Sequence, residues 1–94
     1  MRLEDICNPV SLKVLQYVLR HGQANITRLS RETGIHHSVA RKHLARLVEL
    51  GILEERRYER LHIYAARLRD PRVAALKRLL EELDHLARMW GADA

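Results

Sequence analysis

NITRLSRETGIHHSVARKHLARLVELG, residues 25–51, predicts two helices joined by a tight turn. The first helix is expected to begin at an N-cap residue, either Asn25 or Thr27, whose side chain can accept a bond from a free backbone N–H. It is expected to end at Gly34, because glycine readily adopts the left-handed conformation that closes a helix. The apolar side of this helix is made of three residues: Ile26, Leu29 and Thr33.

The second helix of this pair, expected at about 37–50 with Gly51 after it, has an apolar side and a cationic side. The apolar residues follow the i, i+4, i+7, i+8 spacing of an amphipathic helix: Ala40, Leu44, Leu47 and Val48. The opposite side presents His37, Ser38, Arg41, Lys42, Ala45 and Arg46. A short helix, a glycine turn and a helix of this kind form a helix-turn-helix, whose second helix fits the major groove of duplex DNA.

Length and composition favour one folded domain. The chain has 94 residues, of which 47% are hydrophobic, and this is enough to bury a core. There is no apolar run long enough to cross a membrane and no cleavable signal pattern, so we expect a soluble protein of the cytoplasm, associated with the nucleoid. The single cysteine, Cys7, excludes an internal disulfide and is consistent with a reducing compartment.

The positive charge is concentrated in the middle of the chain. The formal net charge is +5, and basic residues outnumber acidic ones clearly only within 25–69. A basic centre between nearly neutral ends is typical of a surface that binds a polyanion. The alternative is an arginine-rich surface that contacts only water.

Two Asx-Pro pairs mark the starts of further helices. Asn8-Pro9 and Asp70-Pro71 each place a capping side chain before a proline at the first helical position. The helix from Pro9 ends before Gly22 and should be buried on two sides, because apolar residues cover more than half of its circumference: Leu12, Val14, Leu15, Val18 and Leu19. Gln23-Ala24 is expected to be a short connector.

Residues 53–66 change to an alternating pattern, which predicts a β-hairpin that turns near Tyr58-Glu59-Arg60. Its apolar face should pack on the helices through Leu53, Leu61 and Ile63. Its tip carries Arg56, Arg57 and Arg60. A hairpin directly after a recognition helix is the wing of a winged helix, and this one is expected to be basic. The alternative is a basic surface hairpin without a ligand.

The last helix, within 70–94, carries an apolar stripe close to a heptad repeat: Leu76, Leu79, Leu80, Leu83, Leu86, Ala87 and Trp90. The preceding helices can close a core without it, so we expect this stripe to be exposed and to form a homodimer interface together with Leu3 and Ile6. The alternative is that the helix folds back on its own core. The expected fold is mainly α with a small β-hairpin: a winged helix-turn-helix DNA-binding domain over 1–69 and a dimerisation helix over 70–94, within one structural unit.

The order of these elements resembles the ArsR type of small winged-helix transcription regulators, over most of residues 5–66. The most specific parts are CNPVSLKVLQYVL, residues 7–19, and VARKHLARLVELGIL, residues 39–53; MarR-type regulators share the second part. The resemblance implies a dimeric DNA-binding repressor or activator with the helix near His37 in the major groove and the wing on the adjacent backbone or minor groove. One departure is His36, where relatives have a Ser or Thr cap; an imidazole nitrogen can still accept the capping bond.

The candidate binding residues fall into two groups. Four lie near the N-terminal half of the recognition helix and are expected to contact bases: His37, Ser38, Arg41 and Lys42. Arg41 is the best candidate for specificity, because a guanidinium can bond guanine O6 and N7 together. Six arginines are expected to contact phosphates and fix the register: Arg28, Arg31, Arg46, Arg56, Arg57 and Arg60.

No enzyme class gains support, because no nucleophile is placed beside a base and no glycine-rich phosphate loop follows a strand. No cofactor is expected. The Cys-x-Cys and Asp-x-His patterns of metal-sensing relatives are missing, so no metal site is expected either; Asp84-His85 is adjacent and Cys7 is alone. Two other functions stay open, a sequence-neutral architectural DNA-binding protein and a winged helix that binds another protein.

Overall fold

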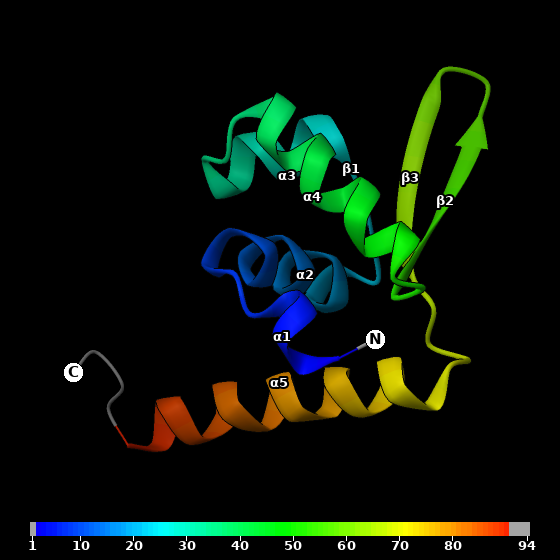
Figure 1. The fold of residues 1–94 in the computed structure, drawn as a ribbon. Helices are drawn as coiled ribbons and strands as arrows, with labels where there is room; N and C mark the ends of the chain where they lie inside the picture. The colour runs from blue at the N-terminus through cyan, green and yellow to red at the C-terminus, as the bar shows by residue number, and fades with distance from the viewer. Residues whose placement is uncertain (1, 91–94) are drawn as a thin grey trace.

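In the computed structural model, which describes residues 2–90, five helices and three strands form a winged helix-turn-helix with a long terminal helix (Figure 1). This confirms the predicted fold class. The elements in chain order are α1 (Leu3–Ile6), α2 (Pro9–His21), β1 (Gln23–Asn25), α3 (Ile26–Thr33), α4 (His37–Glu49), β2 (Leu53–Tyr58), β3 (Leu61–Ala66) and α5 (Pro71–Met89).

The helices begin where capping chemistry predicts. Asn8 Oδ1 accepts bonds from the N–H groups of Val10 and Ser11 at 3.0 and 3.2 Å, and Asp70 Oδ1 accepts one from the Arg72 N–H at 2.9 Å. For α3 the cap is Asn25 and not Thr27, because the backbone N–H of Arg28 donates to Asn25 Oδ1 at 2.8 Å. His36 also caps α4 with its imidazole ring, as expected: the Ser38 N–H donates to His36 Nδ1 at 3.3 Å.

Helix α2 is the centre of the core and is buried on two sides, as expected. Val14, Leu15 and Val18 have no exposed surface. The helices of the predicted pair pack on α2 through four residues that are also fully buried: Leu29, Ala40, Leu44 and Leu47. The apolar stripes of α3 and α4 therefore face inward, which leaves their polar sides to the outside.

The expected connector is a third strand. Residues Gln23–Asn25 form β1, which pairs antiparallel with β3 and gives the sheet order β1-β3-β2. Ala24 lies opposite Tyr64 in this pairing, and both side chains are buried. A strand of three residues has no periodicity of its own, so only pairing with a distant segment stabilises it.

The predicted buried face of the wing, residues 53–66, is only partly right. Leu53 is buried as expected, but Leu61 is 54% exposed and Ile63 is only partly covered. Tyr64 and Ala65 are the buried residues of β3. One reason is the register, which pairs Ile63 with Arg56 and Leu61 with Tyr58, on the other face of the hairpin from Leu53. The other is that the hairpin extends beyond the helices, so Leu61 lies at its tip (Figure 1).

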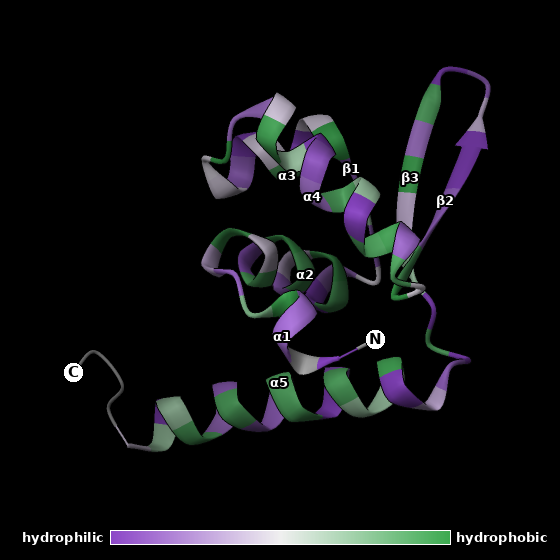
Figure 2. Cartoon of the chain, in the orientation of Figure 1, coloured by the Kyte–Doolittle hydropathy of each residue, from purple (hydrophilic) through white to green (hydrophobic). Residues whose placement is uncertain are grey.

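Helix α5 lies on the far side of α2 from α4 (Figure 1). Val73 is buried and two further leucines, Leu76 and Leu80, pack against the core, so one side of the helix does fold back on its own chain. The rest of the stripe stays open, and the hydrophobic segments of α5 are visible in Figure 2. The exposed apolar residues of this helix end are Leu79, Leu83, Leu86, Met89 and Trp90.

The N-terminal part of the expected dimer interface needs a correction. Ile6 is 2% exposed and belongs to the core cluster of its own chain, because α1 is inserted between α2 and α5 (Figure 1). It is therefore not free to contact a second copy. The side chain of Leu3 lies outside the described residues. None of the helices in the described part of the chain is both long and apolar enough to span a membrane.

Candidate nucleic-acid interface

The polar side of α4 is open to solvent. Ser38, Arg41 and Lys42 are exposed and His37 is half-buried, all in the N-terminal half of the helix. Within the described residues, α5 lies on the far side of α2 and does not cover this side. The four residues predicted to contact bases therefore lie together on an accessible helix face whose opposite side is anchored in the core.

A hollow of about 680 Å³ separates this helix from the wing. We call it the wing hollow; its wall is formed by the start of α3, the start of α4 and one face of the hairpin. It brings His37 and Arg41 together with Arg57 and Arg60, so residues predicted for bases and residues predicted for phosphates meet in one concave surface. The remaining lining residues are Asn25, Ile26, Thr27, Glu55, Leu61, His62 and Tyr64.

The wing is not basic in net charge, which corrects the expectation. Its three arginines are matched by three glutamates, Glu54, Glu55 and Glu59. Arg56 Nη2 lies 2.8 Å from Glu54 Oε1, and Arg57 Nε lies 3.1 Å from Glu55 Oε1. The hydrogen bond from Arg56 is the main cause that lowers the pKa of Glu54. The hydrogen bond from Arg57 does the same for Glu55. The cationic excess of the interface is therefore on α3 and α4.

His62 is a member of the site that the sequence did not single out. Its Nδ1 lies 2.9 Å from Glu55 Oε1, the same oxygen that accepts from Arg57. The three residues meet because Arg57 pairs with His62 across the hairpin and Glu55 is two residues earlier on the same face. Knowing the hairpin register would have been enough to find this cluster.

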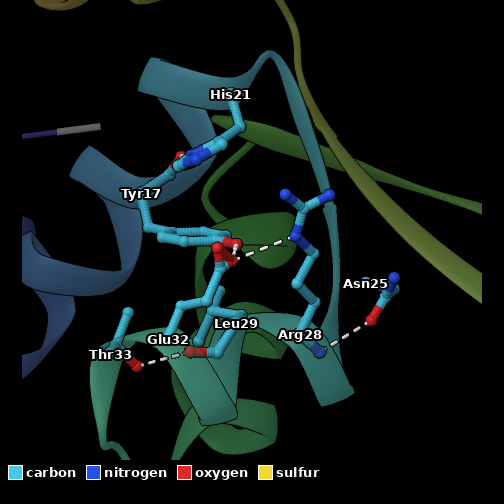
Figure 3. A network of polar contacts seen from close by, with 7 residues as sticks. All are labelled: Tyr17, His21, Asn25, Arg28, Leu29, Glu32 and Thr33. Carbon is cyan, nitrogen blue, oxygen red and sulfur yellow. Dashed lines mark hydrogen bonds and ion pairs between the residues drawn. The ribbon is translucent and has the colours of Figure 1, made fainter.

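Arg28 is held by a network between α2 and α3 (Figure 3). Its Nε donates to Glu32 Oε2 at 3.0 Å, and the Tyr17 hydroxyl donates to the same oxygen at 2.6 Å. The Tyr17 bond is the main cause that lowers the pKa of Glu32, while burial, followed by the bond to Glu32, raises the pKa of Tyr17. The i,i+4 spacing of Arg28 and Glu32 was visible in the sequence, but the contribution of Tyr17 depends on helix packing.

The other predicted phosphate contacts are distributed along the two helices. Arg31 is exposed on α3. Arg46 is exposed on α4 and lies 4.0 Å from Asp5 of α1. These two arginines stand apart from the wing hollow, whereas Arg57 and Arg60 line it.

The histidines are used in separate places. His36 caps α4, His62 contacts Glu55, and His21 stacks on the Tyr17 ring with 4.1 Å between ring centroids. Within residues 2–90 no three His, Cys, Asp or Glu side chains gather into a group that would hold a metal ion.

Comparison with known proteins places this geometry in a family. A family model described as a helix-turn-helix domain matches residues 6–56, more than half of the chain. No curated protein sequence matches significantly.

Solved structures share the fold over most of the chain. A protein described as a predicted DNA-binding transcriptional regulator from E. coli superposes with a TM-score of 0.76 at 23% identity, over 86% of this chain and 83% of that one. HlyU from Vibrio cholerae gives 0.75 at 25% identity, over 86% and 85%. The homodimeric winged helix-turn-helix DNA-binding domain of a possible ArsR-family regulator from Mycobacterium bovis gives 0.71 at 23%, over 90% and 78%. The resemblance to ArsR-type winged-helix regulators is thereby confirmed.

Proposed function

Because the chain belongs to the helix-turn-helix domain family, we propose that it is a transcription regulator that binds specific sequences of double-stranded DNA as a homodimer. The observation that carries this proposal is the exposed N-terminal half of α4. Ser38, Arg41 and Lys42 are accessible there, while Ala40 and Leu44 fix the same turns of the helix in the core. A rigid helix with polar side chains on its open face is what major-groove recognition requires.

In this proposal residues 1–69 bind DNA, with α4 in the major groove and the wing on the adjacent backbone or minor groove. His37, Ser38, Arg41 and Lys42 contact base edges. Phosphate contacts come from the arginines of both helices and of the wing: Arg28, Arg31, Arg46, Arg56, Arg57 and Arg60. The E. coli structure of the same fold, described as a predicted DNA-binding transcriptional regulator, supports this assignment.

Residues 70–94 form the contact between two copies. Leu79, Leu83 and Leu86 are 51%, 52% and 40% exposed, and Trp90 is 81% exposed. An apolar stripe of this kind at the edge of a small domain is typical of an interface. Leu76 and Leu80, which already touch the core, would form the inner border of the contact. The M. bovis domain of similar fold is described as homodimeric, which supports this arrangement.

The test is a selection of binding sites from random duplex DNA, followed by competition with an excess of random duplex. A regulator keeps its selected site under competition, and that site is an inverted repeat with half-site centres about 10 bp apart. A sequence-neutral architectural protein loses the site to the competitor. Failure to bind any duplex at low salt would reject DNA binding and favour a protein partner.

The salt dependence of binding is measured in the same experiment. With several phosphates contacted per copy, log K should fall with log salt by about 0.9 for each phosphate. An affinity that does not change between low and physiological salt would contradict the assignment of the arginines to the DNA backbone.

A further inference from the structure

The wing hollow contains one carboxylate, Glu55, among cationic groups. Its Oε1 is 3.1 Å from Arg57 Nε and 2.9 Å from His62 Nδ1. The Glu55 side chain is 28% exposed and the His62 side chain 42% exposed. Both groups are therefore fixed by their contact and still accessible to an incoming ligand.

The protonation of His62 decides whether the wing carries a net charge. With His62 neutral, the three arginines and three glutamates of residues 53–66 cancel. With His62 protonated, the wing carries one net positive charge. Histidine is the side chain whose ordinary pKa, about 6.5, allows this change near physiological pH.

We propose that the wing hollow binds a phosphodiester group of the DNA backbone and that His62, held by Glu55, takes up a proton when the phosphate enters. The inference rests on the proposed function and names a ligand group for one part of that interface. A phosphate brings a second negative charge next to the imidazole, in addition to Glu55, and two anions favour the imidazolium form. Its protonated ring can then donate one bond to Glu55 and one to the phosphate.

The other groups that face His62 decide how strongly binding and protonation are coupled. The start of α3 contributes uncharged residues, Asn25, Ile26 and Thr27, and α4 contributes His37 and Arg41. The hairpin contributes Arg57, Arg60 and Tyr64 besides Glu55. The arginines, which outnumber Glu55, leave the hollow positively charged while it is free of anions. A phosphate offsets their charge, so the proton is taken up on binding.

The expected consequence is an affinity for DNA that decreases as pH rises from about 6 to 8 at constant ionic strength. One proton taken up per copy changes the affinity of that copy by as much as about tenfold per pH unit. His62→Gln, which keeps a hydrogen-bonding side chain but does not titrate, should still bind at every pH with a flatter dependence. The matched control is His85→Gln on α5, an exposed histidine outside the hollow, which should keep the wild-type dependence.

Two more variants distinguish the contributions of Glu55 and His37 to the pH dependence of DNA binding. Glu55→Gln removes the carboxylate, so binding at pH 8 should become tighter and the change between pH 6 and 8 smaller. His37→Gln tests whether the second histidine of the hollow causes the pH dependence. If His37→Gln removes the pH dependence and His62→Gln does not, the assignment to His62 is overturned.

A direct readout is the NMR titration of the histidine rings, in which the His62 signal is identified by its loss in His62→Gln. Adding a mixed-sequence duplex should raise its titration midpoint, and adding inorganic phosphate at the same concentration of phosphate groups should not. An equal response to inorganic phosphate would mean a small-anion site and would overturn the DNA assignment. Duplex binding without any pH dependence overturns this inference alone, whereas no duplex binding at any pH rejects the proposed function.

Discussion

Arg41 is the residue at which chemistry and position agree most closely. It is exposed on α4 and lines the wing hollow beside His37. Its planar guanidinium can bond two acceptors of guanine at once, which a lysine cannot do. In the proposed function, Arg41 reads a base, while its neighbours in the hollow hold the backbone.

We expect Arg41→Ala to weaken binding to the selected site by about 1–3 kcal/mol and to relax the base preference at one position of each half-site. Arg41→Lys should recover part of the affinity but not the preference, because it restores only the charge. The measurement is a set of binding isotherms on sites changed at single positions. A loss that is uniform over all sequences would show that Arg41 contacts phosphate.

The ionisation of Asp70 predicts how the stability of the fold depends on pH. Hydrogen bonds from Arg72, first from its side chain and then from its backbone N–H, lower the pKa of Asp70 from 3.8 to about 2. Because the pKa is lower in the folded state, the stability that Asp70 contributes is complete above pH 4 and is lost as the pH falls toward 2.

Asp70→Asn keeps a capping oxygen but removes this titration. Between pH 4 and 2 the free energy of unfolding should therefore fall more for the wild type than for Asp70→Asn. Denaturant unfolding followed by circular dichroism at several pH values measures the difference. Since Glu32, Glu54 and Glu55 also have lowered pKa values, both proteins lose stability in acid, and only the difference reports Asp70. Parallel curves would contradict the assignment.

Among the structural elements, the turn between α3 and α4 depends on one glycine. Gly34 has φ 76°, in the left-handed region, and a Cβ at this position would meet no atom within 4 Å. A side chain here would therefore cost conformational energy alone, without a steric clash.

Gly34→Ala should lower the free energy of unfolding by about 1–2 kcal/mol. Gly34→Asn, which tolerates the left-handed region better than alanine, should cost clearly less. Equal losses for the two variants in denaturant unfolding would mean that the turn changes shape when glycine is replaced. In that case, the DNA affinities of the two variants would have to be compared under conditions in which their free energies of unfolding are equal.

The same elements show how far the sequence predicts this fold. Helix ends were predictable because caps such as Asn8 and Asp70 act within three residues of the helix they start. β1 and the buried Tyr64 were not, because they depend on pairing between segments far apart in the chain. The neutral wing was visible in the sequence, since Glu54 and Glu55 stand next to its arginines. The contact of Glu55 with His62 needed the register of the hairpin.

The described part of the molecule has two candidate interaction surfaces on opposite sides of α2. The polar side of α4 is on one side and the exposed stripe of α5 is on the other. Val73, Leu76 and Leu80 pack α5 against the core, and Arg20 of α2 forms an exposed ion pair with Asp84 of α5 at 2.8 Å. Changes to the stripe should therefore leave α4 folded.

We expect Leu83→Glu to convert a dimer into a monomer, because a charge at the centre of an apolar contact loses its hydration without gaining a partner. Its helical circular dichroism should stay unchanged, and its affinity for an inverted repeat should fall to that for a single half-site. Arg78→Glu, on the polar side of the same helix, is the matched control and should remain dimeric. Light scattering measures the outcome; a wild type that is monomeric at micromolar concentration would refute the interface.

The position of α2 between the two surfaces has a consequence for operator architecture. In the proposed dimer, the separation of the two recognition helices depends on the distance of each α4 from the two-fold axis, and the packing of α2 between α4 and α5 contributes to that distance. Leu19 and Leu80, which line the groove between α2 and α5, contribute to it without approaching DNA. Repacking them would change the spacer length that is tolerated between half-sites, while the bases preferred inside each half-site stay the same.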